Sequence, residues 1–228
     1  MPSAPGTAAT VVWIVDGDTL DVTLTGTRTR VRLINIDAPE LGHDGAASQC
    51  LADEAERALA GLAPPGATVT LASYGNDRYG RLLAGAHLAD GRLVNAEVVR
   101  LGLAGPLVVD GQKPLLDAVA AARDEAARAG AGLHGAASCS VPGRLSAART
   151  RLDAVPPNPT RAEAQGLIPS AEAAAAEASA VAAQLHADVR DALVQGLTAD
   201  EYGRADAAAS RLRTDADATL ARLRTAAG

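Results

Sequence analysis

Three short segments of the sequence combine carboxylates with arginines next to stretches of aliphatic and β-branched residues. They are 16–19 (Asp-Gly-Asp-Thr), 32–40 (Arg-Leu-Ile-Asn-Ile-Asp-Ala-Pro-Glu) and 77–81 (Asp-Arg-Tyr-Gly-Arg). At strand ends and turns, a rigid scaffold can present such polar side chains. Carboxylates, backbone carbonyls and water are ligands for Ca²⁺ or Mg²⁺, and the segments contain no His or Cys that would favour zinc. The three segments therefore indicate a site for a hard cation, with Asp18 and Asp37 as its oxygen donors.

Arg32, Arg81 and Glu40 extend this chemistry towards phosphate. A guanidinium is permanently charged and matches phosphate geometry, and a third carboxylate can orient or deprotonate a water molecule. Taken alone, an Asp-Gly pair is usually a hairpin turn and an arginine on a strand usually faces solvent. Carboxylates, a cation and two arginines together suit displacement at phosphorus, where negative charge builds on the equatorial oxygens.

The elements that must position these residues begin with strands. Alternating and β-branched runs separated by Gly, Asn and Asp predict five of them. The predicted strands are 10–15, 19–24, 30–36, 69–73 and 82–88. The chain has no Phe, one Trp and three Tyr, so the core must be aliphatic and surfaces for stacking on bases are few.

Three helices are expected beside these strands, at 47–60, 95–101 and 114–128. Asn95 is predicted to cap the second helix, and Pro114 is expected in the first turn of the third. Five strands and three helices in this order are consistent with a small closed barrel that has helices packed beside it.

The last third of the chain changes character. A short helix near 144–154 is expected to precede a stiff, proline-punctuated linker that ends at 169. Two long Ala-rich helices follow. The first is expected from Ser170 to Gly196, and the second opens at Thr198 with Glu201 completing a capping box. Their apolar stripes predict an antiparallel hairpin. We expect this hairpin to be a packing or spacing appendage, with no chemistry of its own and no identifiable partner.

The predicted domains are a flexible N-terminus at 1–9, a barrel domain at 10–140, a short helix and Pro-rich linker at 141–169, and an Ala-rich helical hairpin at 170–228. The formal net charge is −6, and no basic stripe is visible. Binding to nucleic acid is therefore expected to be weak and salt-sensitive away from a local site. No apolar run approaches the ~20 residues of a membrane span, and no targeting segment is recognised at the N-terminus.

From about residue 11 to 139, the chain resembles the staphylococcal nuclease (thermonuclease) family. The resemblance lies in three signature segments, 15–19, 31–40 and 77–83, and in the following helix at 96–104. It implies an α+β fold: an OB-fold-like five-stranded barrel with three packed helices, here followed by the C-terminal helical hairpin. It also implies a Ca²⁺-dependent hydrolase that cuts single-stranded DNA and RNA and leaves 3′-phosphates.

The resemblance assigns roles residue by residue. Asp18, Asp37 and the backbone carbonyl of Ala38 would hold Ca²⁺. Glu40 would act on the attacking water as its base or by orienting it, and Arg32 and Arg81 would bind the scissile phosphate. Supporting roles around these groups fall to Asp16, Thr19, Asp77 and Tyr79.

Some positions depart from the family pattern. The best-studied member has tyrosines where this chain has Leu107 and Val109, and its basic loop aligns with 44–47, which contains no Lys. These differences affect substrate affinity and leave the chemistry intact. An alternative function is therefore a weak or inactive domain that binds nucleic acid or protein, with the hairpin as its working surface. The presence of all five principal side chains favours the active enzyme.

Cys50 and Cys139 resemble cysteines that exported relatives carry near these points. The resemblance implies a disulfide between them and an oxidising, exported location. Two buried thiols that never meet are the alternative, and the compartment is otherwise unassigned.

Overall fold

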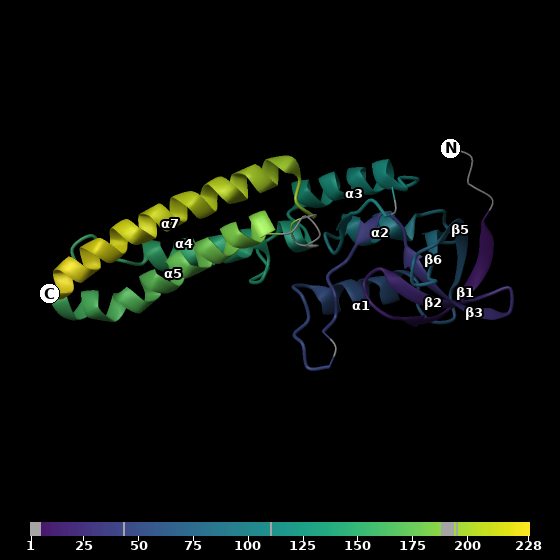
Figure 1. The fold of residues 1–228 in the computed structure, drawn as a ribbon, viewed down its shortest axis with the longest axis horizontal. Helices are drawn as coiled ribbons and strands as arrows, with labels where there is room; N and C mark the ends of the chain where they lie inside the picture. Colours follow the sequence, from purple (N-terminus) through teal and green to yellow (C-terminus); the bar gives the residue numbers. More distant parts are fainter. Residues whose placement is uncertain (1–5, 43, 110, 188–193, 195) are drawn as a thin grey trace. The chain divides into compact units, whose positions relative to one another are not determined.

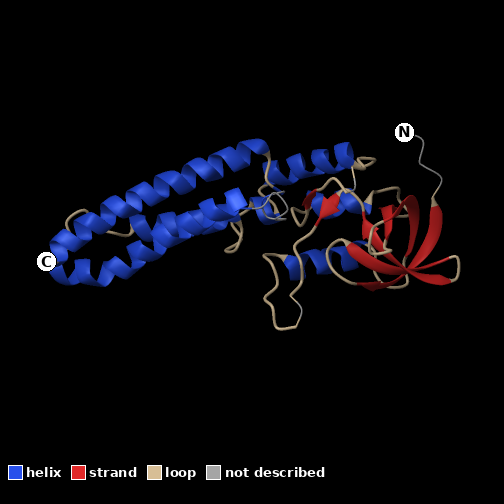
Figure 2. Cartoon of the chain, viewed as in Figure 1, coloured by secondary structure: helices blue, strands red, loops and turns tan. Residues whose placement is uncertain are grey.

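The computed structural model describes residues 6–42, 44–109, 111–187, 194 and 196–228 (Figure 1). The chain divides into two compact units, one up to His134 and one from Gly135 onward. Among the described residues, every strand belongs to the first unit, and the second unit is helical (Figure 2).

Five strands of the first unit form a closed barrel in the order β1-β2-β3-β6-β5. They are β1 (Thr7–Ile14), β2 (Thr19–Leu24), β3 (Thr27–Leu33), β5 (Thr68–Asn76) and β6 (Leu82–His87). Neighbouring strands are antiparallel except β3 and β6, which pair in parallel. A separate two-stranded sheet joins β4 (Ile36–Asp37) to β7 (Gly105–Pro106). The predicted α+β fold with a five-stranded barrel is confirmed.

Three helices share one hydrophobic core with the barrel. They are α1 (Ala52–Leu62), α2 (Val94–Arg100) and α3 (Leu116–Ala129), and a short 3₁₀ helix, η1 (Gly132–His134), follows. The buried positions of these helices are mainly Ala, Val and Leu, as in the barrel interior. A core without Phe is therefore filled by interlocking aliphatic side chains, as the composition predicts.

Several predicted strand and helix ends are wrong by a few residues. β1 begins at Thr7, inside the segment predicted to be flexible, because Thr7 and Ala8 pair with β5. β3 ends at Leu33, not at 36. Asn35 has a φ of 63°, which lies outside the extended region that a strand requires. α1 begins at Ala52, not at 47, since Leu51 has a φ of 65°.

Asn95 and Pro114 do not act as predicted. Asn95 is fully buried inside α2, and its side chain accepts a hydrogen bond from the Ala86 N–H and donates to the Ile34 carbonyl. It therefore ties α2 to the barrel and does not cap the helix. Pro114 lies before α3, which starts at Leu116.

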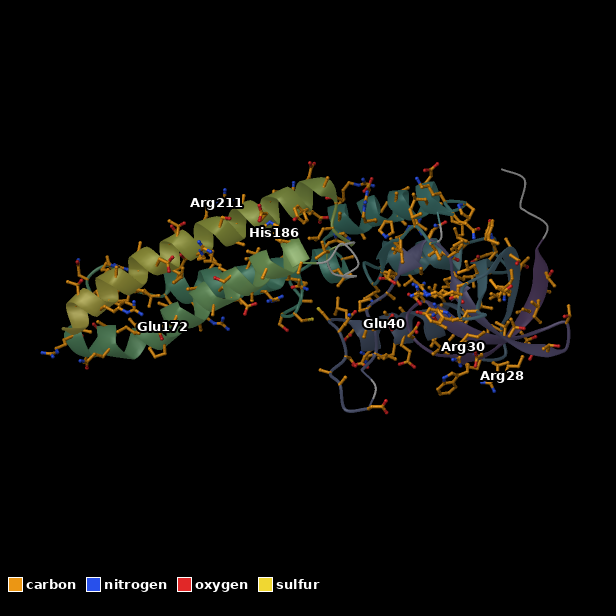
Figure 3. The ribbon with its side chains drawn as sticks, in the orientation of Figure 1. Arg28, Arg30, Glu40, Glu172, His186 and Arg211 are labelled. Atoms are coloured by element: carbon orange, nitrogen blue, oxygen red, sulfur yellow. The ribbon has the colours of Figure 1, made fainter. Side chains whose placement is uncertain are left out.

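In the described part of the chain, the second unit contains α4 (Val141–Asp153), α5 (Arg161–Ala187) and α7 (Ala199–Ala227), packed around a shared aliphatic core. Ion pairs join the first half of α5 to the end of α7, Glu172 with Arg224, and the end of α5 to the first half of α7, His186 with Asp206. These helices are therefore antiparallel, as predicted (Figures 1 and 3). α4 packs along both, so the hairpin is part of a three-helix bundle.

The predicted start of α5 is wrong. Thr160 and Glu163 form a reciprocal cap, so the helix begins at Arg161 and runs through Pro169. The strong cap and the surrounding Ala residues outweigh the hydrogen bond that proline cannot donate. The predicted end near Gly196 borders residues outside the described part of the chain. The predicted capping box of Thr198 and Glu201 is present at the start of α7. None of the helices in the described ranges is both long and apolar enough for a membrane crossing.

Candidate active site

Asp18 lies in the turn between β1 and β2, with only 3% of its surface exposed. The turn closes because Asp16 Oδ1 accepts a hydrogen bond from the Asp18 N–H at 2.9 Å. A Cβ atom on Gly17 would lie 2.7 Å from the Cβ of Ala38 and 2.5 Å from that of Ala55. Only glycine allows this close approach, so the packing of α1 against the turn fixes Asp18 beside Ala38.

The Asp18 carboxylate is held from both sides. Its Oδ1 accepts a hydrogen bond from Thr19 Oγ1 at 2.9 Å, and its Oδ2 accepts one from the Ala38 N–H at 2.8 Å. Arg32 Nη1 lies 3.0 Å from the same Oδ2. Asp18 is therefore oriented by the backbone of the loop that carries Asp37.

Arg32 connects the two predicted cation ligands. Its Nη1 donates to the carbonyls of Leu33 and Ile36 at 2.9 and 2.8 Å, and its Nη2 donates to Asp37 Oδ1 at 2.8 Å. With 7% of its surface exposed, Arg32 is buried between Asp18 and Asp37. These bonds use three of the five N–H groups of the guanidinium, and no described hydrogen bond uses the other two.

Burial shifts the titration of both carboxylates. Desolvation raises the pKa of Asp18 to about 8, although the Arg32 charge opposes the shift. Desolvation also raises the pKa of Asp37 to about 6, again against Arg32, and the Glu40 charge adds to the rise. A buried and a half-buried carboxylate thus share one guanidinium, so a second positive charge would favour their ionised forms.

Glu40 lies in the loop that follows β4. Asp37 pairs with Gly105 of β7, which anchors the start of this loop. Further along, the Glu40 N–H donates to Gln49 Oε1 at 2.9 Å and the Gln49 N–H donates to the Glu40 carbonyl at 2.9 Å. The side chain of Glu40 is exposed (Figure 3). The loop therefore presents Glu40 to solvent close enough to Asp37 to affect its pKa.

Arg81 is positioned by its own turn. Asp77 Oδ1 accepts hydrogen bonds from the backbone N–H groups of Tyr79 and Arg81, both at 2.9 Å. Asp77 Oδ2 accepts one from Arg81 Nε at 2.7 Å. Burial on its own would raise the pKa of Asp77, but these hydrogen bonds lower it overall. The Arg81 guanidinium lies 5.6 Å from the centre of the Tyr79 ring, and its side chain remains 31% exposed.

The parallel pairing of β3 with β6 places the two arginines on neighbouring strands. Val31 pairs with Leu82 and Arg32 pairs with Leu83. Arg81 immediately precedes Leu82, so it lies where the end of β3 meets the start of β6. The two arginines, 49 positions apart in the sequence, therefore belong to one edge of the barrel.

The predicted site residues thus form two groups. One group surrounds Asp18 and contains Asp16, Thr19, Arg32, Asp37 and Ala38. The other contains Asp77, Tyr79 and Arg81. Among the described hydrogen bonds and ion pairs, none joins the two groups directly. Cys50 and Cys139 belong to neither group, and each is disulfide-bonded.

Two buried asparagines in this region are not found by reasoning from the sequence. The Asn35 side chain donates to the carbonyls of Leu107 and Gln112 and accepts from the Leu115 N–H. It thereby fixes the segment that contains β7 and pairs with Asp37. Asn95 bridges α2 to the barrel beside Ile34. The positive φ needed at residue 35 is one that Asn tolerates, and this is the only signal that could have identified it.

The residues around Asp18 suit a hard cation. Within the described ranges, no three His, Cys, Asp or Glu side chains form a ready-made metal cluster. The available donors are the carboxylates of Asp18 and Asp37 and nearby backbone carbonyls, all of them oxygen. A bound cation would favour the ionised forms of the two carboxyl groups that share Arg32, so the donor set fits a hard cation.

Comparison with known proteins adds a family match. A family model described as "Staphylococcal nuclease homologue" matches residues 30–134. This range includes Arg32, Asp37, Glu40 and Arg81, whereas Asp18 lies before it. An "Uncharacterized endonuclease" of Escherichia coli O157:H7 is 39% identical over 94 residues, which cover 41% of this chain and 57% of that protein.

Two further relatives match a similar share of the chain. "Protein ParB" of Escherichia coli is 37% identical over 102 residues, covering 41% of this chain and 54% of that protein. "Endonuclease YhcR" of Bacillus subtilis (strain 168) is 37% identical over 113 residues, covering 45% of this chain and 9% of that protein. The chain therefore spans little more than half the length of the first relatives it matches.

Proposed function

We propose, from the premise that residues 30–134 form a staphylococcal-nuclease-like domain, that this chain is a Ca²⁺-dependent nuclease. Its substrates would be single-stranded DNA and RNA, and its products would end in 3′-phosphates. The observation that carries the proposal is the pair of anchored arginines at one edge of the barrel, one of them, Arg32, bound to Asp18 and Asp37. The word endonuclease in the names of two relatives supports the same reaction class.

The two arginines are suited to bind a phosphate without rearrangement. Arg32 keeps two N–H groups after its bonds to the protein. Arg81 is held through Nε by Asp77, which leaves its Nη groups for a ligand. Donors that are fixed before the substrate arrives stabilise transition-state charge without a reorganisation cost.

Glu40 would act on the attacking water. Its carboxylate is exposed on a loop that Gln49 closes, so it can reach solvent and a bound substrate. A carboxylate in this place can accept a proton from water or orient it for attack at phosphorus.

Asp18, Asp37 and the carbonyl of Ala38 would hold the cation. Ca²⁺ bound there would supply positive charge to the phosphate oxygens during the reaction. Thr19 and the Ala38 N–H keep the Asp18 carboxylate oriented, and Arg32 keeps Asp37 oriented. Asp16 stabilises the turn that carries Asp18.

A cleavage assay tests the proposal. The purified chain is incubated with end-labelled single-stranded DNA and RNA in Ca²⁺, in Mg²⁺ and in excess chelator. Cleavage in Ca²⁺, its loss in chelator, and products whose mobility changes when a phosphatase removes the 3′-phosphate are expected. Asp18→Asn should abolish activity, whereas the matched control Asp53→Asn, at an exposed position of α1, should not.

Two outcomes would contradict the proposal in different ways. Full activity in chelator would exclude the role of the cation. No cleavage with any divalent cation, together with retained binding of the oligonucleotide, would favour a non-catalytic binding domain.

A further inference from the structure

The only tryptophan of the chain is presented to solvent by an irregularity in β1. Val11 pairs with Val22, but the next paired residue is Trp13, opposite Asp21. Val12 is the extra residue of this bulge. Because the bulge shifts the alternation by one position, Val12 and Trp13 both face outward and Ile14 returns to the core. Trp13 is 58% exposed, although an indole would normally be buried in an aliphatic core.

Two arginines extend from the same outer surface of the barrel. Arg28, Arg30 and Arg32 alternate along β3, so they lie on one face, opposite to Val31 and Leu33 in the core. Arg28 is 64% exposed and Arg30 is 51% exposed at the side chain (Figure 3). Arg32, the last of the three, belongs to the candidate active site.

Cross-strand pairing connects the tryptophan to these arginines. Trp13 pairs with Asp21 of β2, and Asp21 pairs with Arg30 of β3. The row therefore crosses three adjacent strands. Asp21 accepts hydrogen bonds from Arg28 Nη2 at 2.8 Å and from Arg30 Nε at 2.8 Å. One buried carboxylate thus fixes two guanidiniums, and the trio keeps one net positive charge.

The surface defined by Trp13, Arg28 and Arg30 combines the two features that single-stranded nucleic acid requires. Fixed arginines attract phosphates, and an exposed aromatic ring stacks on an unpaired base whatever its identity. Successive outward residues on β3 lie roughly 6.6 Å apart, comparable with the spacing of phosphates in an extended strand. The arginine row also runs directly to Arg32.

We propose that the outer surface of β1, β2 and β3, formed by Trp13, Arg28 and Arg30, binds the single strand of substrate that leads away from the active site. This proposal rests on the proposed function, because it places the row as an extension of the same site. Arg28 and Arg30 contact consecutive phosphates, and one unpaired base stacks on the Trp13 indole. The surface therefore selects single strands over duplexes, whose bases are already stacked.

Tryptophan fluorescence measures this binding separately from cleavage. Since Trp13 is the only tryptophan, its emission reports on this surface alone. In excess chelator, oligothymidylate of about 12 nucleotides should quench the emission in a saturable manner. An abasic oligonucleotide with the same number of phosphates should quench far less, as should polyglutamate. Equal quenching by all three would overturn stacking and indicate a general anion-binding surface.

Charge variants test the arginines. Arg28→Gln with Arg30→Gln should weaken binding of oligothymidylate about tenfold and lower its dependence on salt, with the logarithmic slope falling by about 0.7 for each phosphate that is no longer neutralised. Asp21→Asn removes the neutralising carboxylate, so it should tighten binding. If Asp21 has only a structural role, Asp21→Asn should bind oligothymidylate no more tightly than the parent protein. Arg57→Gln, an exposed arginine on α1, is the matched control and should change neither quantity.

Cleavage separates failure of this proposal from failure of the proposed function. The double arginine variant should raise KM for long oligonucleotides and leave cleavage of a dinucleotide unchanged, because a dinucleotide reaches only the active site. Quenching without any cleavage would support the proposed binding surface and contradict the proposed nuclease activity. Cleavage of long strands without quenching, unaffected by the arginine variants, would overturn the surface.

Discussion

Arg32 and Arg81 illustrate how single residues gain a functional position through contacts with the protein itself. Arg32 is held by two carbonyls and two carboxylates, and Arg81 is held by Asp77. The two differ in burial, since Arg32 is enclosed and Arg81 is partly open. Removal of Arg32 would leave the buried Asp18 and the half-buried Asp37 without a counter-charge, so Arg81 is the better residue for separating catalysis from folding.

Arg81→Ala should reduce turnover by two orders of magnitude or more, with a small effect on stability. A fixed cation aimed at transition-state charge contributes about 3 kcal/mol, whereas a partly exposed ion pair contributes about 1 kcal/mol or less to folding. Turnover and a thermal melt are measured on the same sample. Arg92→Ala, which breaks an exposed ion pair with Asp90, is the control. If the loss of rate equals the loss of folded protein, Arg81 is only structural.

Asp18 should make the cation-free protein less stable as pH rises. Its pKa is raised by burial to about 8, above the value in the unfolded chain. The stabilisation from its protonated form is therefore complete at low pH and is lost as pH rises towards about 8. Asp37, whose pKa is about 6, adds a similar loss at lower pH.

Urea unfolding in chelator at about pH 5, 7 and 9 measures this loss of stability. Asp18→Asn cannot ionise, so the variant should lose less stability over this range than the parent protein. A parallel decline in both proteins would show that Asp18 does not titrate in this range.

At the scale of single residues, the sequence motifs identify the charged residues of the site but not the neutral residues that support them. Asp18, Asp37 and Arg32 stand out because carboxylates and arginines next to strands have few structural explanations when they occur together. Asn35 contacts residues more than 70 positions away. No local pattern encodes such a contact, and Asn in a sequence usually indicates a turn or a cap.

Among the elements, those with strong local signals are the best predicted. β2 matches its predicted range, and the Thr198 capping box marks the start of α7. The prediction fails where tertiary contacts override local preference. Pro169 suggests a linker, but burial of Ala164 and Ala171 on either side keeps α5 continuous. The β1 bulge is equally invisible in the sequence, because it depends on the register in which β1 pairs with β2.

Asn35 should be important for the element that positions Asp37. Asn35→Ala removes three partly buried hydrogen bonds and places an alanine at a φ of 63°, so it should cost roughly 3 kcal/mol or more of unfolding free energy. Asn35→Gly removes the same bonds but tolerates this φ. It should be less destabilising by about 1 kcal/mol.

Urea unfolding of both Asn35 variants checks this difference, and cleavage assays at low temperature show whether the site is disturbed in the folded fraction. Equal stability of the parent protein and both variants would exclude the structural role of Asn35.

At the scale of the whole molecule, charge is distributed unevenly. The net charge is −6, yet arginines concentrate on β3, next to the candidate active site. Long-range attraction of nucleic acid should therefore be weak, and binding should depend on short-range contacts that salt screens. The second unit has its own aliphatic core, and its described residues add no group of metal-binding side chains.

Cys50 and Cys139 are each disulfide-bonded, and they are the only cysteines of the chain. We predict that they pair within one chain. A bond that closes a loop of about 90 residues constrains the unfolded chain and should stabilise the fold by about 4 kcal/mol at most.

Neither cysteine belongs to the described groups around Asp18 and Arg81. Reduction should therefore lower the melting temperature while cleavage at low temperature continues, and Cys50→Ser with Cys139→Ser should behave like the reduced protein. Peptide mapping without reductant should recover one cross-linked peptide from a monomer. Dimers on a non-reducing gel would instead indicate bonds between chains, and free thiols under oxidising conditions would exclude the disulfide.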